Sequence, residues 1–132
     1  MAKSLIRENS TVFRAIRSST WIVDGKVSVT AFKLRETDNG KLSILLEANC
    51  LNRICSARLN SCWGEILLNS EKVFELGLDI ESDPLPDILY HAVILNLPGP
   101  DDIVMSELMA TKLRETVQAV NKKSKKYGKV SP

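Results

Sequence analysis

The sequence has little of what metal sites and disulfide frameworks require. His91 is the only histidine among the 132 residues, and no Cys-x-x-Cys pair occurs, so the ligand pattern of a zinc site is missing. The three cysteines, Cys50, Cys55 and Cys62, are an odd number at spacings that do not suit a disulfide framework. We expect reduced thiols that behave as small apolar groups, with a redox pair of Cys50 and Cys55 as the alternative. We expect no metal and no cofactor.

Membrane segments and catalytic signatures are missing as well. No apolar run approaches the roughly 20 residues that a helix needs to span a bilayer. The first ten residues, MAKSLIRENS, lack the apolar core of a secretory signal, so we expect a cytoplasmic protein. The sequence contains no G-x-x-x-x-G-K-[ST], G-x-G-x-x-G, G-x-S-x-G or H-E-x-x-H motif.

What is present is an ordinary globular composition. Hydrophobic residues make up 44% and charged residues 26% of the 132 residues, which suits a single folded domain. Strand-like runs, short helical segments and a late helical pattern follow one another along the chain. This order predicts an α+β fold with a mostly antiparallel sheet. We expect the domain to cover residues 11–121, between a frayed start at residues 1–10 and a basic tail at residues 122–132.

The strands of the first half are predicted from apolar runs and turn residues. Residues 11–16 suit a first strand. Asp24 and Gly25 supply the positive φ angles of a tight hairpin turn after a short apolar run. Asn39 and Gly40 predict a second hairpin, which would join residues 27–36 to residues 42–47.

The second half is predicted to contain three helices, two further strands and a brief strand at residues 78–80. Asn49 can cap a mid-chain helix that ends near Asn60, and Ser70 can cap a short helix that ends at Gly77. Residues 63–69 and 88–97 suit strands. A long helix from residue 102 to about residue 124 would pack on one face of the sheet through an apolar stripe. The stripe consists of Ile103, Val104, Leu108, Met109, Leu113, Val117 and Val120.

Four residues are candidates for a ligand or catalytic site. Arg14 interrupts an apolar strand, and Arg17 follows three residues later. Both could bind an anion, because a guanidinium group presents paired donors to phosphate or carboxylate. Trp21 could stack on a ring. His91 is the only side chain that could form a Cys-His or Ser-His pair. The structural alternatives are an exposed or edge arginine, a core tryptophan and a neutral histidine bonded inside the sheet.

The charge of the chain is concentrated at its C-terminal end. Residues 112–132 contain seven basic residues and one glutamate, whereas residues 1–111 contain 11 basic and 15 acidic residues. A basic end can bind nucleic acid or another acidic surface. It can also be a solvated helix end, since cations favour the C-terminus of a helix. The candidate contacts are Lys122, Lys123, Lys125 and Lys126.

Two resemblances rest on the framework residues. The segments VFRAI, GKVSVTAFKL, LSILLE, WGEILL and DPLPDILYHAVI resemble small bacterial proteins to which no function is assigned. That resemblance covers residues 12–97 and implies a bacterial cytoplasmic domain. The first strand, with Arg14, is similar to the opening of the RES-type NAD-dependent toxins, which have an ADP-ribosyltransferase-like fold. The G-G-R-W-N stretch of those toxins is missing here, so only Arg14 matches.

Two classes of function follow from these observations. The first is a non-enzymatic module that binds an unknown protein partner through a sheet edge or the long helix. The second is a small enzyme or an anion-binding or nucleotide-binding domain that uses Arg14, Arg17, Trp21 and His91. We prefer the first class, because no catalytic set is complete in the sequence. Weak nucleic-acid binding by the basic tail is a further alternative.

Overall fold

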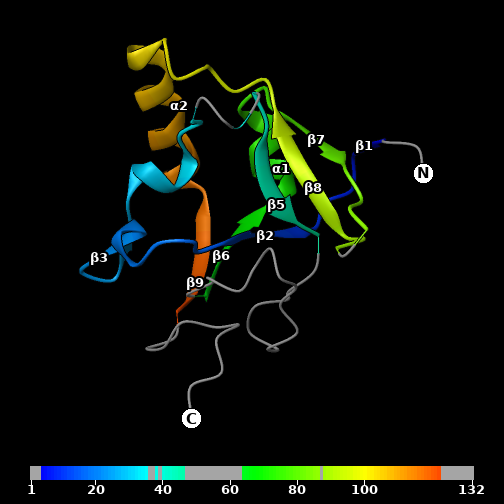
Figure 1. Cartoon of the computed structure of the whole chain (residues 1–132), viewed down its shortest axis with the longest axis horizontal. Helices are drawn as coiled ribbons and strands as arrows, with labels where there is room; N and C mark the ends of the chain where they lie inside the picture. Colours follow the sequence, from blue (N-terminus) through cyan, green and yellow to red (C-terminus); the bar gives the residue numbers. More distant parts are fainter. Residues whose placement is uncertain (1–3, 36–37, 39, 47–63, 87, 123–132) are drawn as a thin grey trace.

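A seven-stranded antiparallel sheet with helices on one face forms the body of the protein (Figure 1). The computed structural model describes residues 4–35, 38, 40–46, 64–86 and 88–122. In this sheet the strands follow the order β1-β7-β8-β5-β2-β6-β9, and β3 and β4 form a separate hairpin. The α+β class and the mostly antiparallel sheet predicted from the sequence are therefore confirmed.

The strands and helices of the fold are short. The strands of the large sheet are β1 (Leu5–Ile6), β2 (Thr11–Ala15), β5 (Leu42–Leu45), β6 (Gly64–Asn69), β7 (Asp79–Ser82), β8 (His91–Leu95) and β9 (Val117–Lys122). The hairpin consists of β3 (Ile22–Val23) and β4 (Lys26–Val27). The helices are α1 (Ser70–Glu75) and α2 (Ile103–Glu115), with the 3-10 turns η1 (Ser19–Trp21) and η2 (Val29–Phe32).

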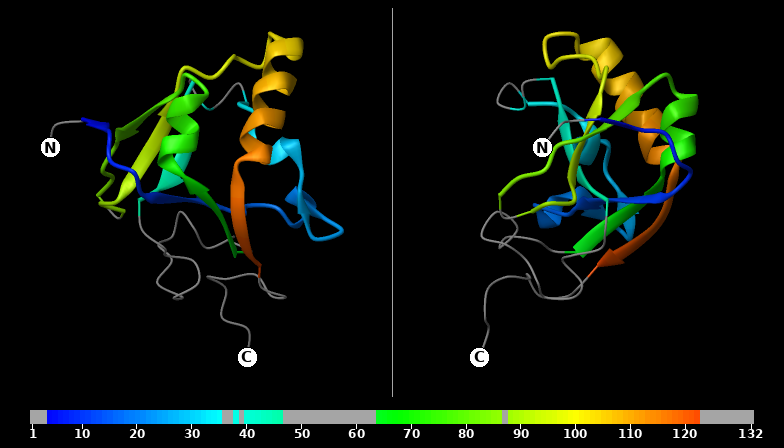
Figure 2. Two further views of the ribbon diagram at one scale, coloured as in Figure 1. Left: turned by 180° about the vertical axis from the view of Figure 1, so that it is seen from behind. Right: turned by 90° about the vertical axis from the view of Figure 1, so that its right-hand side faces the viewer.

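The main core lies between the sheet and the helices, on what we call the helical face. Alternate side chains of the central strands point to this face, among them Val12, Ile44 and Ile66. They pack with Val73 of α1 and with Ala110 and Leu113 of α2, and Figure 2 shows α1 continuing from β6 and α2 leading into β9. The opposite face carries a smaller cluster of Ala15, Leu45 and Ile88.

Local signals predicted several elements correctly. Strand β2 matches the expected first strand, and Asp24 and Gly25 have φ angles of 53° and 77° in the turn of the β3–β4 hairpin. Helix α1 is followed by Gly77 at a φ of 84°, as its glycine end predicted. Its N-cap is Asn69, whose side chain accepts hydrogen bonds from two backbone amides of the first turn, rather than Ser70.

The second predicted hairpin is wrong. Val27 is the last residue of β4, and residues 28–35 do not form a strand, because Ser28 caps the 3-10 turn η2 by accepting a hydrogen bond from the Thr30 amide. The turn lets the neighbours Ala31 and Phe32 both reach the core, which consecutive residues of a strand cannot do. Strand β5 instead pairs with β2 and β8.

The long C-terminal helix is shorter than predicted. Helix α2 ends at Glu115, and residues 117–122 form strand β9, which pairs with β6. The spacing of Val117 and Val120 suits one side of a helix, yet a bulge in β9 places both on the helical face. Leu68 pairs with Val117 and Leu67 pairs with Ala119, so Gln118 is the extra residue.

Two further expectations concern the start and the middle of the chain. Residues 5 and 6 are not frayed as expected, because β1 pairs with β7 through Leu5 with Glu81 and Ile6 with Ile80. The mid-chain helix predicted at residues 49–60 lies outside the described residues. Within the described part of the chain, no helix has the length and apolarity to cross a membrane.

The two leucines of α2 provide a matched test of this packing. Leu113 is fully buried, whereas Leu108 is 43% exposed. We expect Leu113→Ala to lower the free energy of unfolding by about 3 kcal/mol, because it removes buried methyl groups and leaves a cavity. Leu108→Ala is expected to cost less than about 1 kcal/mol. Urea unfolding of the two variants measures the difference, and equal losses would contradict the orientation of α2.

Candidate functional site

Arg14 lies on the helical face of β2, between the buried side chains of Val12 and Ile16. Its Nε donates a hydrogen bond to the Ala31 carbonyl at 3.0 Å. Its Nη1 donates to the Ser43 carbonyl at 2.8 Å. The guanidinium carbon also lies 4.8 Å from the centre of a Trp21 ring, within the range of a cation–π contact.

These contacts join three segments that are distant in sequence. Strands β2 and β5 share the register pair Phe13 and Leu45, and in a continued ladder Ala15 would lie opposite Ser43. Beyond the register pair, the Arg14 side chain supplies the donor for the Ser43 carbonyl. The same guanidinium binds the backbone of η2 through Ala31. Arg14 therefore acts as a cross-link between β2, β5 and η2.

Arg14 belongs to a cluster of three arginines and one carboxylate. Burial lowers the pKa of Arg14 to about 10, Asp38 opposes this shift, and the other two arginines add to it. The pKa of Arg17 is lowered by burial and by the charge of Arg35. Arg35 forms an ion pair with Asp38 at 3.2 Å, and its backbone amide donates to the same carboxylate. Arg14 thus stays charged at neutral pH.

His91 is separated from this cluster by the sheet. Its register partner is Leu45, which pairs in turn with Phe13, and both of these belong to the cluster on the opposite face. Arg14 points to the helical face. The structure brings Arg14, Arg17 and Trp21 into one neighbourhood, but it does not bring His91 to them.

The immediate partner of His91 is Asp83. Nδ1 of His91 lies 3.0 Å from the Asp83 carbonyl oxygen and 3.4 Å from a carboxylate oxygen of the same residue. Because a carbonyl oxygen can only accept, Nδ1 carries the proton in the first contact. This is the backbone-bonded histidine inside the sheet that the sequence offered as the structural alternative.

Sequence reasoning missed one buried carboxylate. Glu65 of β6 is fully buried, and it faces the same side of the sheet as its register partner Ala15. His91 lies on the same side but three strands away across β2 and β5, which is about 14 Å at the usual strand spacing. The two residues therefore do not form an acid–base pair.

Helix α2 has an exposed apolar surface that the predicted stripe did not anticipate. Its buried positions are Ser106, Ala110 and Leu113. Val104 lies about 180° around the helix from Leu113, since nine residues turn 100° each. Four large side chains in the first two turns are exposed, and we call them the α2 patch. They are Ile103 at 77%, Val104 at 75%, Met105 at 42% and Leu108 at 43%.

The remaining candidates are the lysines of the basic tail and the three cysteines. Lys122 is the last residue of β9, while Lys123, Lys125 and Lys126 fall outside the described residues. The three cysteines fall outside them too. Within the part of the chain that is described, no group of three or more metal-binding side chains is close enough to hold an ion. Nucleic-acid binding by the tail stays a prediction.

No protein-family model matches the chain, and neither a curated protein nor a solved structure matches it. The two resemblances seen in the sequence therefore stay predictions. Of the four candidate residues, three are close together and one is bonded on the opposite face of the sheet.

We expect Arg14→Ala to lower the free energy of unfolding by about 2 kcal/mol. The change removes the donor of the part-buried Ala31 carbonyl, and a buried acceptor left without a donor costs about 1–3 kcal/mol, whereas the exposed Ser43 carbonyl can bond to water. Arg14→Lys is not expected to restore stability, because an ammonium group cannot reproduce the fork of a guanidinium. Chemical unfolding monitored by tryptophan fluorescence measures both.

Arg35→Ala is the matched control for this prediction. The Arg35 side chain is 79% exposed, and its ion pair with Asp38 is a surface pair. Its removal is expected to cost less than about 1 kcal/mol. An Arg14→Ala variant as stable as the Arg35→Ala variant would contradict the role of Arg14 as a cross-link.

Proposed function

We propose that this chain is a cytoplasmic, non-enzymatic interaction module that binds another protein through the α2 patch. The observation that carries the proposal is the exposure of Ile103, Val104, Met105 and Leu108 within two turns of one helix. Exposed apolar residues that are scattered singly are normal on a protein surface, whereas a contiguous group indicates an interaction site. An amphipathic helix that presents such a group can lie in the apolar groove of a partner.

The charges beside the patch define the kind of partner. Residues 98–111 contain no basic residue, and they contain the acids Asp101, Asp102 and Glu107. Asp102 caps α2 by accepting from the Met105 amide, and Glu107 forms an ion pair with Lys33. Asp101 is exposed and forms no ion pair within the described part of the chain. A partner with an apolar groove and a basic rim would complement this surface.

The packing of α2 supports this assignment over a purely structural one. The buried residues Ala110 and Leu113 of α2 belong to the main core. The ion pair between Lys33 and Glu107 connects the helix to the segment after η2. Val104 and Leu108 point away from this core, and all four side chains of the α2 patch are exposed, so the patch contributes little to the packing of the domain. Its removal should therefore leave the fold intact.

The double variant Val104→Ser, Leu108→Ser tests the proposal. Proteins captured from an extract of the source cells would be identified by mass spectrometry, purified and titrated against the chain by calorimetry. We expect the double variant to weaken binding at least tenfold, because apolar anchors of an interface each contribute about 1–2 kcal/mol. Its unfolding midpoint is expected to stay close to that of the unchanged protein.

Two controls keep this experiment decisive. Leu89→Ser and Val23→Ser each remove a large side chain that is exposed elsewhere, at 69% and 57%, and neither is expected to weaken binding. Equal binding by the double variant would contradict the proposal. A dimer of the isolated chain in sedimentation, abolished by the double variant, would assign the patch to self-association instead.

A further inference from the structure

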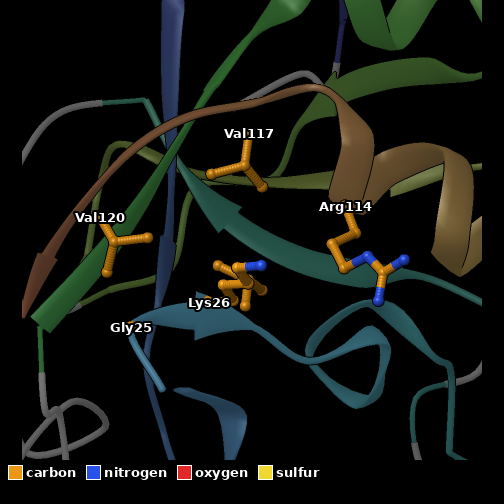
Figure 3. Close-up of a pocket in the computed structure, with 6 residues that line it drawn as sticks. Gly25, Lys26, Arg114, Val117 and Val120 are labelled. Carbon is orange, nitrogen blue, oxygen red and sulfur yellow. The ribbon is translucent and has the colours of Figure 1, made fainter. Parts of the chain in front are cut away.

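A groove lies between the β3–β4 hairpin, the end of α2 and the helical face of β9 (Figure 3). Its volume is about 470 Å³. Val27, Val117 and Val120 give it apolar walls, and Gly25 contributes backbone at the tip of the hairpin. The two remaining lining residues are both cations, Lys26 of β4 and Arg114 near the end of α2.

Neither cation of this groove, Lys26 or Arg114, forms an ion pair with a residue that the structure describes, whereas ion pairs occur elsewhere on the surface. The acids nearest to them in sequence, Asp24 and Glu115, do not line the groove. An occupant with a negative charge and an apolar body would therefore fit its walls better than water does.

Strand β9 adds a second feature that is independent of the side chains. It is the last strand of the sheet and pairs with β6, and among the described strands none pairs with its other edge. Alternate residues of such an edge direct their N–H and C=O groups outward. An extended segment placed beside β9 could satisfy these groups, which is the mode of recognition known as strand addition.

We propose that the groove binds an extended peptide segment of another protein, which adds a strand to the free edge of β9. The bound segment places an acidic side chain between Lys26 and Arg114. Its apolar side chains, at alternate positions, contact Val117 and Val120. This site is separate from the α2 patch and does not depend on it.

The sequence of β9 argues against a second copy of this chain as the occupant. Residues 117–122 read VQAVNK, which contains one lysine and no acid. The terminal residues 123–132 contain four lysines and no acid. Both segments would bring positive charge to a groove that already holds two cations. The bulge in β9 further disfavours regular pairing between two copies of the strand.

A random twelve-residue peptide library displayed on phage tests this proposal with the intact chain as bait. We expect enrichment of peptides that carry glutamate or aspartate flanked by β-branched or aromatic residues at alternate positions. The best peptide, made synthetically, is expected to bind at least tenfold more weakly to the variant Lys26→Glu, Arg114→Glu. Replacing its acid by the corresponding amide should weaken binding to the unchanged protein to a similar extent.

Two controls assign the binding to this groove. The variant Lys72→Glu, Lys112→Glu makes the same change in net charge at two exposed lysines outside the groove, and it should bind the peptide as the unchanged protein does. The variant Val104→Ser, Leu108→Ser should also bind normally, because the α2 patch is a different surface. The bound peptide should slow amide hydrogen exchange in β9.

Three results would overturn the proposal. The first is that enriched peptides lack acidic residues, and the second is that reversing the charges of Lys26 and Arg114 leaves the affinity unchanged. The third is that protection from exchange appears in the first turns of α2 and not in β9. Loss of binding only in the variant of the α2 patch would place the peptide on that patch. A negative result for one of the two sites therefore does not affect the test of the other.

Discussion

One guanidinium group, bonded to two backbone carbonyls, connects three segments of the first half of the chain. Arg14 binds the carbonyl oxygens of Ala31 and Ser43 at 3.0 Å and 2.8 Å, and it lies over the Trp21 ring. These contacts connect β2 to η2 and to β5 beyond the point where the backbones of β2 and β5 pair with each other. Hydrogen bonds from a charged donor are stronger than neutral ones, so one side chain can replace several backbone pairs.

Segment η2 in turn packs against the main core and against helix α2. Ala31 and Phe32 of η2 enter the main core, and Lys33 pairs with Glu107 of α2. Helix α2 therefore buries Ala110 and Leu113 and presents its first two turns to solvent. The hairpin before η2 lies beside β9, which creates the cationic groove. Both proposed interaction surfaces therefore involve elements next to η2, namely α2 and the β3–β4 hairpin.

Sequence reasoning was accurate where local chemistry decides the structure. Asp24 and Gly25 predicted the β3–β4 turn, and Gly77 predicted the end of α1, because positive φ angles need such residues. The hairpin predicted from Asn39 and Gly40 is wrong, because β5 pairs with β2 and β8 and not with the segment before it. Val117 and Val120 fit a helix as well as a bulged strand, so their spacing alone could not separate α2 from β9. The role of Arg14 depends on carbonyls 17 and 29 residues away, and no local pattern reveals it.

Nuclear magnetic resonance of the Arg14 side chain tests the central claim most directly. A scalar coupling across the hydrogen bond between Arg14 Nε and the Ala31 carbonyl carbon would be measured at neutral pH, before and after addition of inorganic phosphate. The account predicts an observable coupling, slow exchange of the Nε proton with water, and no change with phosphate. A rapidly exchanging Nε proton whose resonance moves as phosphate is added would contradict it, because Arg14 would then be an anion-binding residue.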